Sequence, residues 1–189
     1  MILTEKRTYN GDDIHQRFAY KFLRKDVSAI GDVVIFRGPM DVTTNLIDQE
    51  DLLNNDYIWS DDAINIIWEI PNLCPLGAVA FQRLFNTQIA SLLTAACNVP
   101  ISVDGDDLMF SNDIDGYEQL KKGSVSITIS KNNVALGHTG INITAGSQAP
   151  SFAYSTGLDD TQVIFLMNDI EQCFYDLLND MFIATTKVI

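Results

Sequence analysis

The sequence is poor in the residues that most often bind metal ions. It has three cysteines, Cys74, Cys97 and Cys173, and two histidines, His15 and His138. The cysteines are far apart and form no C-x-x-C pair, so the spacing typical of zinc sites is absent. An odd number of cysteines in a chain without a signal peptide favours buried free thiols over disulfides. We therefore expect no zinc site and no catalytic cysteine.

Basic residues are also scarce. The chain has 12 Lys and Arg against 25 Asp and Glu, a formal net charge of −13. Nucleic-acid binding depends on cations that displace counterions from phosphates, so this charge argues against DNA or RNA as a direct partner. The sequence has no run of about 18 apolar residues, and no apolar signal segment follows its first residues. We therefore expect a cytoplasmic protein whose main partner is neither nucleic acid nor membrane.

Length and composition favour one folded domain. The 189 residues are 47% hydrophobic and 10% aromatic. A chain of this size buries most of the surface that it exposes when unfolded, and its composition differs from that of disordered chains. The sequence therefore predicts a single domain over residues 1–189, which folds alone or as a homo-oligomer.

Periodic patterns predict an α+β fold. Ile14, Phe18 and Phe22 lie at four-residue steps, as on one face of a helix, whereas Ile64 and Ile66 begin an alternation typical of a strand. We expect helices at 12–24, 75–96 and 159–183, strands at 2–7, 33–36, 64–70, 101–103, 108–110, 124–130 and 134–144, and a loop at 145–157. A mostly antiparallel or mixed sheet would then be covered on one face by the three helices.

Acidic residues are dense in one stretch of the chain. They are Asp41, Asp48, Glu50, Asp51, Asp56, Asp61 and Asp62. Such carboxylates could bind a guanidine-like group or a magnesium ion or act as general acids, but acidic residues are also typical of exposed loops and helix caps. Glu69 has a stronger case, because it shares with Asn65 the polar face of an otherwise apolar strand, where burial raises a carboxyl pKa.

Three cationic or titratable residues lie in or next to predicted strands. Arg37 ends an apolar strand, so it is either a clamp for a ligand carboxylate or part of a structural ion pair. His138 lies near Gly137 and Gly140, which allow close approach of a ligand or of another backbone, and a hydrogen-bonded core histidine is the alternative. Lys122 has the sequence of an exposed surface lysine.

Several short motifs resemble one protein family, the uncharacterised-domain family 366. They run in order from about residue 7 to residue 143. They are Gly31-Asp32 with Val34 and Phe36-Arg37-Gly38, then Asp48, Glu50 and Asp51, then Ser60-Asp61-Asp62 with Glu69, then Gly105-Asp106-Asp107, and finally His138 with Gly140-Ile141-Asn142. The resemblance implies a role in 7-deazaguanine metabolism.

The order of elements also resembles the catalytic domain of biotin and lipoate ligases. Lys122 before a strand and Gly140-Ile141-Asn142 in the next strand carry this resemblance. It implies a ligase-like fold and makes Lys122 and Asn142 candidate ligand contacts. Those ligases also use a loop rich in glycine and arginine around an acyl-adenylate, whereas residues 36–45 contain one glycine and one arginine, and fold alone does not establish activity.

Three functions follow from these observations. The first is an enzyme that acts on a guanine-like heterocycle, because paired carboxylates can accept hydrogen bonds from its ring N–H and exocyclic amine. The best specific hypothesis is a lyase that decarboxylates 7-carboxy-7-deazaguanine without a metal or an organic cofactor. The alternatives are a ligase or acyltransferase of the biotin and lipoate type, and a non-catalytic small-molecule-binding module.

We expect one pocket to join the candidate residues. Glu69, Asp61 or Asp62 would be the catalytic acid, with a pKa raised by burial and by neighbouring carboxylates. The substrate-binding candidates are Arg37, Lys122, His138 and Asn142. Of these, Arg37 or Lys122 would orient the substrate carboxylate.

Overall fold

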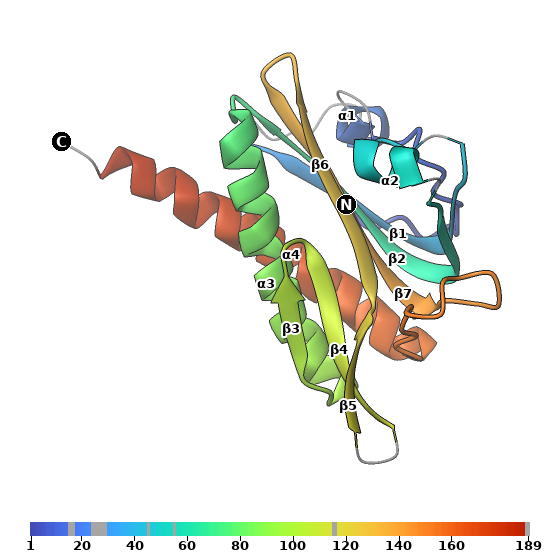
Figure 1. The fold of residues 1–189 in the computed structure, drawn as a ribbon. Helices are drawn as coiled ribbons and strands as arrows, with labels where there is room; N and C mark the ends of the chain where they lie inside the picture. Colours follow the sequence, from blue (N-terminus) through green and yellow to red (C-terminus); the bar gives the residue numbers. More distant parts are fainter. Residues whose placement is uncertain (15–17, 24–29, 45, 55, 115–116, 188–189) are drawn as a thin grey trace.

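The computed structural model of the protein describes residues 1–14, 18–23, 30–44, 46–54, 56–114 and 117–187 (Figure 1). The helices are α1 (Phe18–Leu23), α2 (Gln49–Asn54), α3 (Pro75–Cys97) and α4 (Asp160–Thr186), and the strands are β1 (Asp32–Val42), β2 (Ile58–Pro71), β3 (Ile101–Asp104), β4 (Asp107–Ile114), β5 (Tyr117–Lys122), β6 (Ser124–Lys131) and β7 (Val134–Thr144). This mixture of helices with antiparallel strands confirms the predicted α+β class. The sequence patterns did not predict α2 or β5.

The main sheet has four antiparallel strands in the order β1-β2-β7-β6. The N-terminal segment runs parallel to β1, where Leu3 N donates to Ile35 O at 2.8 Å and Tyr9 N donates to Pro39 O at 2.9 Å. The predicted strand at 2–7 is therefore an extended segment with scattered bonds to β1. Those bonds bring Tyr9 onto the sheet.

Strands β3, β4 and β5 form a second, smaller antiparallel sheet. The chain passes from this sheet to the main one at Gly123, whose N–H donates to Leu108 O and whose carbonyl accepts from Asn142 N, both at 2.9 Å. A Cβ at Gly123 would collide with the ring of Phe110, so this close approach needs glycine. The crossing places the end of β5 beside the end of β7.

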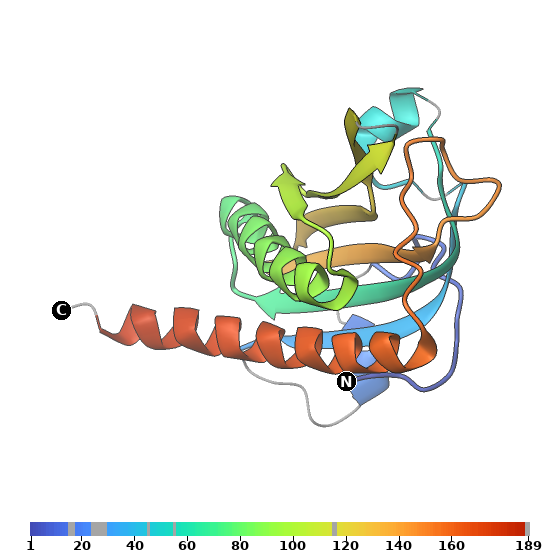
Figure 2. The ribbon, with the colours of Figure 1, turned by 90° about the horizontal axis from the view of Figure 1, so that it is seen from below.

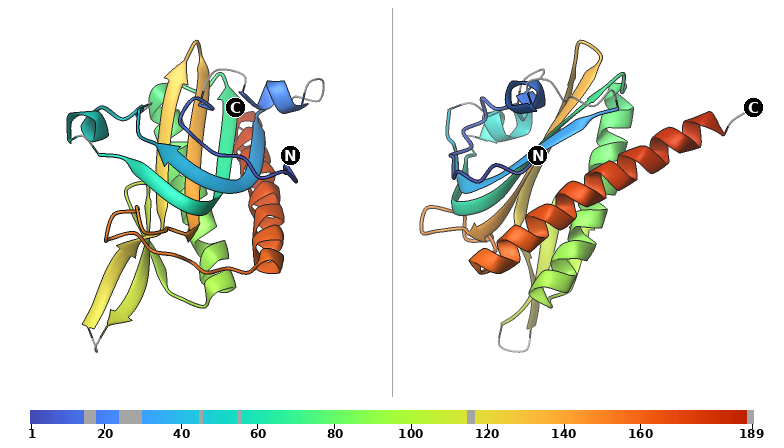
Figure 3. Two further views of the ribbon diagram at one scale, coloured as in Figure 1. Left: turned by 90° about the vertical axis from the view of Figure 1, so that its right-hand side faces the viewer. Right: turned by 180° about the vertical axis from the view of Figure 1, so that it is seen from behind.

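Helices α3 and α4 cover one face of the main sheet (Figure 3). Val33 and Ile35 of β1 face them, and Trp68 of β2 packs against Phe81 of α3 at 5.1 Å between ring centroids. Phe81 also contacts Phe174 of α4 edge to face. This aromatic cluster buries the apolar face that each helix presents.

The opposite face is covered by α1 and the N-terminal segment. Phe18 and Ala19 pack with Val34 and Phe36, which alternate with the β1 residues that face α3 and α4. The prediction that three helices cover one face was therefore wrong, because α1 lies on the other side. Residues 15–17 and 24 of the predicted first helix, including His15, lie outside the described residues.

Helix α4 runs along the sheet, and its C-terminal turns extend beyond the rest of the fold (Figure 2). Its first turn has a capping box, in which Asp159 accepts from Thr161 N and Gln162 N while Gln162 Oε1 accepts from Asp159 N. None of the described helices is long and apolar enough to cross a membrane.

The Asp159 cap predicts a measurable loss of stability. Asp159→Ala leaves two backbone N–H groups without their acceptor, so we expect the free energy of unfolding to fall by about 1 kcal/mol. Urea unfolding followed by circular dichroism measures this. Asp180→Ala, an exposed position inside the same helix, is the matched control, and equal losses in the two variants would show that the cap contributes nothing.

Candidate functional site

A cavity of about 440 Å³ opens on the face of the main sheet opposite α3 and α4, at edge strand β6. Its volume lies within the range of small-molecule sites. Its wall includes residues from six parts of the chain. They are the N-terminal segment (Tyr9, Gly11), the stretch from the end of β1 to the start of β2 (Val42, Leu46, Ile47, Asp48, Asp51, Asp56, Tyr57, Ile58, Trp59), the turn before β4 with its first residue (Asp106, Asp107), the end of β5 with the first half of β6 (Lys122, Ser124, Val125, Ser126, Ile127), β7 (His138, Asn142) and the loop before α4 (Pro150, Phe152, Ala153).

Aromatic rings and branched aliphatic side chains form much of the wall. Tyr9, Tyr57, Trp59 and Phe152 supply the rings. Trp59 Nε1 donates to Asp61 Oδ1 at 2.8 Å and Tyr57 Oη donates to Gln148 O at 2.8 Å, so both rings are oriented from outside the cavity. Such walls suit a flat ligand.

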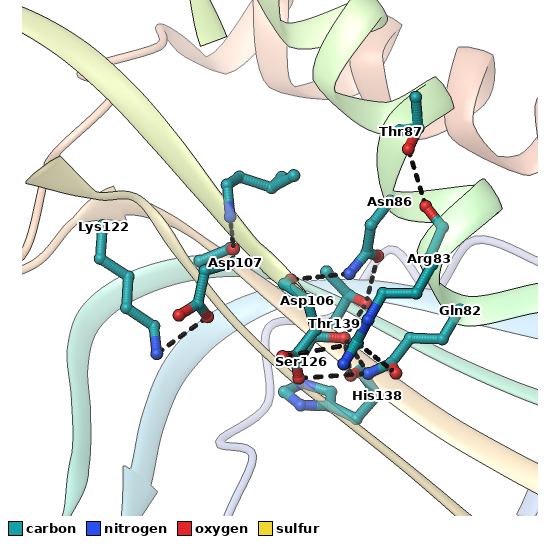
Figure 4. A network of polar contacts seen from close by, with 12 residues as sticks. Gln82, Arg83, Asn86, Thr87, Asp106, Asp107, Lys122, Ser126, His138 and Thr139 are labelled. Atoms are coloured by element: carbon teal, nitrogen blue, oxygen red, sulfur yellow. Dashed lines mark hydrogen bonds and ion pairs between the residues drawn. The ribbon is translucent and has the colours of Figure 1, made fainter. Parts of the chain in front are cut away.

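Lys122 and Asp107 form an ion pair at the cavity, with 2.8 Å between Nζ and Oδ1 (Figure 4). The pair forms because β4 begins at Asp107 and β5, its neighbour, ends at Lys122. Burial raises the pKa of Asp107, the Lys122 ammonium opposes this, and Asp106 and Asp104 add to the rise. A carboxyl with a raised pKa next to a cation has the properties of a general acid.

Asn142 supplies a buried acceptor near the same end of the cavity. The residue is 5% exposed, and its side-chain Oδ1 has no hydrogen-bond partner among the described residues. The backbone N–H of Asn142 donates to Gly123 O, one residue from Lys122. A buried acceptor without a partner is costly, so a ligand N–H bonded to it would recover that cost.

His138 is a neutral, oriented side chain in the cavity wall. It is 2% exposed, it stacks on Tyr9 at 3.6 Å between ring centroids, and Nε2 lies 3.1 Å from Asn65 Oδ1. Burial lowers the pKa of His138 to about 3. The ring therefore carries no charge near neutral pH.

This depressed pKa predicts a pH-dependent stability. The unfolded chain binds a proton at His138 below pH about 6.5 and the folded chain only below about 3, so stability falls as pH falls through that window. The slope is about 1.4 kcal/mol per pH unit at most. We expect wild type to lose about 2 kcal/mol more than His138→Phe between pH 7 and pH 4.5 in urea unfolding. Equal losses in the two proteins would contradict the neutral buried ring.

A polar network links α3 to the cavity wall (Figure 4). Asn86 Nδ2 donates to Asp106 O at 2.8 Å, and Asn86 Oδ1 accepts from Thr139 Oγ1 at 3.0 Å. Gln82 Nε2 donates to Ser126 Oγ at 2.8 Å. Both amides are nearly fully buried, so this network fixes the turn that precedes Asp107.

Arg37 and Asp62 do not line the cavity. Arg37 Nε and Nη2 bind Asp62 Oδ2 at 2.9 and 2.8 Å, and Nη1 binds Asp160 at the start of α4 at 2.6 Å. Strand alternation turns Arg37 away from the Phe36 face and toward α4. The prediction of one pocket containing Arg37 and Asp62 was therefore wrong, and Arg37 belongs to a structural ion pair, the alternative interpretation.

Glu69 and Asp61 also lie outside the cavity wall. Glu69 is buried at 3% exposure on the same face of β2 as Asn65, as predicted, but four residues further along the strand and opposite Asp32. Asp61 is exposed and accepts the Trp59 hydrogen bond. The cavity thus brings together three of the seven candidates, Lys122, His138 and Asn142.

The sequence analysis missed Asp107 as a site residue. Its motif, Gly105-Asp106-Asp107, was noticed, but nothing local distinguishes Asp107 from a turn residue, because its partner Lys122 is brought to it by strand pairing. Among the described residues no group of three or more His, Cys, Asp or Glu side chains could hold a metal ion. Cys74, Cys97 and Cys173 are free thiols, and Cys74 is exposed rather than buried.

Comparison with known proteins identifies the family. The model of the domain of unknown function DUF366 matches residues 1–189. The chain belongs to this family. An uncharacterised protein of Methanocaldococcus jannaschii, MJ0805, is 29% identical over 167 residues, which are 85% of this chain and 69% of that protein.

Solved structures place this DUF366 protein in a known fold. A protein of unknown function from Pyrococcus horikoshi has a TM-score of 0.83 at 23% identity, covering 100% of this chain and 96% of that one. A biotin protein ligase from Aquifex aeolicus, in complex with biotin and ATP, has a TM-score of 0.52 at 12% identity over 94% of this chain and 72% of that one. The predicted ligase-like fold is thus confirmed by its likeness to a biotin protein ligase.

Proposed function

We propose that this protein is an enzyme that binds a planar, guanine-like heterocycle and removes CO2 from a carboxyl group on it, as in 7-carboxy-7-deazaguanine. One observation supports this most: the Lys122–Asp107 ion pair lies at a cavity with aromatic walls, together with the unpartnered acceptor of Asn142. A cation for the carboxylate, an acid of raised pKa and an acceptor for an N–H group are the three groups that the reaction needs.

The charge of the cavity wall supports a ligand that donates hydrogen bonds. Among the residues that the structure describes, the wall has five aspartates, Asp48, Asp51, Asp56, Asp106 and Asp107, and one cation, Lys122. A guanine-like edge offers a ring N–H and an exocyclic amine, which suit carboxylate and amide oxygens. A bare polyphosphate suits this wall poorly, because like charges repel and phosphate sites are built from cations and backbone N–H groups.

The proposed reaction exchanges one C–C bond for one C–H bond. In the complex Lys122 pairs with the substrate carboxylate instead of with Asp107, and Asp107 in its protonated form donates its proton to the ring carbon that carries this carboxylate. The bond to the carboxyl carbon then breaks, its electron pair stays on the ring, and CO2 leaves. Asp107 is left as a carboxylate and takes a proton from solvent. The electron-rich ring accepts the proton itself, so the step as written requires no organic cofactor.

The proposal moves the acid from Glu69, Asp61 or Asp62 to Asp107. Asp107 is the carboxyl group of raised pKa that lies beside a cation at the cavity. Asp61 is exposed and Asp62 is bound to Arg37 and Lys6. Glu69, Asp61 and Asp62 do not line the cavity, whereas Asp107 does.

A thermal-shift screen tests the binding step. Ligands would be 7-deazaguanine, 7-carboxy-7-deazaguanine, guanine, biotin, lipoate and ATP, because a ligand that binds only the folded protein raises its midpoint. We expect the carboxylated base to give the largest rise and Lys122→Met to remove its advantage over the uncarboxylated base. A rise with none of the bases would refute the proposed substrate class.

The fold favours one second candidate, a ligase or acyltransferase. The Aquifex aeolicus relative in fold is a biotin protein ligase, and Lys122 lies in the cavity wall of this protein. A midpoint raised by ATP together with biotin or lipoate, and not by any base, would support this candidate. Binding of a base without turnover would leave a non-catalytic binding module.

A further inference from the structure

We propose that Asn65 makes His138 a fixed hydrogen-bond acceptor toward the cavity, and that His138 selects ligands with an N–H group at that place. This inference rests on the proposed function for the nature of the ligand, a heterocycle with ring N–H groups. It assigns to Asn65 a positioning role and to His138 a role in specificity. Neither residue takes part in the proton transfer assigned to Asp107.

A chain of two hydrogen bonds fixes the imidazole tautomer. Asn65 Nδ2 donates to Gly38 O at 3.1 Å, which directs Asn65 Oδ1 toward His138. That oxygen can only accept, so Nε2 of His138, 3.1 Å away, must be the donor. In a neutral ring Nδ1 is then the acceptor. Asn65 is fully buried, so water does not compete for these bonds.

The orientation of the ring points Nδ1 away from β2. Nε2 faces Asn65 on β2, and Cε1 lies 3.1 Å from where a Cβ of Gly140 would be. Strand β7 has β2 on one side and β6 on the other, so the remaining nitrogen lies on the side of β6. Val125 and Ile127 of β6 line the cavity on that side.

Two neighbours keep the ring in this orientation. Tyr9 stacks on it with 13° between the ring planes, and Tyr9 is itself bonded to β1 through Pro39 O and Asp41 N. Met40 fills the space above Gly140, where a side chain would collide with its sulfur. The imidazole therefore cannot rotate to exchange its two nitrogens without moving Tyr9 or Met40.

Two acceptors then lie on one face of β7. His138 and Asn142 are four residues apart in the strand, about 13 Å at the usual rise per residue. The Lys122–Asp107 pair is near the Asn142 end, because Gly123 bonds to Asn142. A ligand that donates to His138 while its carboxylate contacts Lys122 is thus bound at both ends. Methylating the donating nitrogen should weaken binding about 10- to 100-fold.

Nitrogen-15 NMR of histidine-labelled protein tests the tautomer without any ligand. The protein has two histidines, and the spectrum of His138→Phe identifies the signals of His138. We expect a neutral ring at pH 7 with the proton on Nε2. A proton on Nδ1, or a charged imidazolium, would overturn the inference.

Titration with guanine, 7-deazaguanine and their ring-N-methylated forms tests the acceptor role. We expect the Nδ1 signal to move on binding, and His138→Phe to reduce the discrimination between parent and methylated base to about threefold or less. Asn65→Asp should weaken the parent base about 10- to 100-fold, because a carboxylate at Nε2 favours the doubly protonated ring. Asn168→Asp on the exposed surface of α4 is the matched control, expected to bind as wild type does.

The outcomes separate the two proposals. If a base raises the melting midpoint and moves the Asn142 side-chain amide but not Nδ1, the role of His138 is wrong and the proposed substrate class stands. If no base binds, the proposed function fails, and the tautomer in the unliganded protein decides whether Asn65 fixes His138 as an acceptor.

Discussion

Replacing Asp107 with asparagine is expected to slow turnover of the carboxylated base about 10²- to 10⁴-fold, the usual effect of losing a general acid. Asparagine has nearly the same shape but no acidic proton, so the base should still bind with about wild-type affinity. Single-turnover kinetics with a separate binding measurement distinguish the two effects. Burial is the main cause of the raised pKa of Asp107, and Asp104 is the smallest of the contributions to it. Asp107 also lies in the cavity wall beside Lys122.

Asp104→Asn is the control for this variant. Asp104 lies in the same β3–β4 hairpin and is exposed, and it is not part of the cavity wall. It should change turnover by less than about threefold, since it acts on Asp107 only through a weak charge interaction. Equal rates for Asp107→Asn and wild type would remove Asp107 from the mechanism.

Replacing Phe81 with alanine is expected to lower the free energy of unfolding by about 3–5 kcal/mol. Phe81 is fully buried and contacts Trp68, Phe85 and Phe174, so its ring joins β2, α3 and α4. Truncation removes the ring's contacts and leaves a cavity that rigid neighbours cannot fill. Chemical unfolding at equilibrium measures the loss.

Phe165→Ala is the matched control. Phe165 is in the first half of α4 but 65% exposed, so its removal should change stability by no more than about 0.5 kcal/mol. A loss for Phe81→Ala as small as that for Phe165→Ala would show that the aromatic cluster does not hold the helices on the sheet.

Local sequence patterns predicted helices and strands well where a single periodicity of hydrophobic residues dominates the segment. The strand at 134–144 and the helix from Pro75 agree with the structure almost to the residue, since alternation and a helix-starting proline are local signals. Pairing between distant strands is not local. The transfer of the chain from the small sheet to the main one at Gly123 depends on a carbonyl of β4 and an N–H of β7.

The candidate site was predicted in part for the same reason. The alternation of side chains along a strand predicted which face of β2 carries Glu69. The distance of Glu69 from the cavity depends instead on the pairing register of β2, which places Glu69 opposite Asp32 rather than near Trp59. Arg37 was correctly seen as either a ligand clamp or an ion-pair member. Only the fold places Asp160, which lies 123 residues later in the chain, within reach of the Arg37 guanidinium. Asp107 and Lys122 became a pair through the register of β4 and β5.

The central claim is that this DUF366 protein decarboxylates a guanine-like base, and one measurement tests it most directly. Purified protein is incubated with 7-carboxy-7-deazaguanine, with and without EDTA and with and without ATP, and the base is followed by mass spectrometry. We predict loss of one CO2 per molecule of base, abolished or strongly slowed in Asp107→Asn. A base that binds but stays intact with and without ATP would contradict the claim.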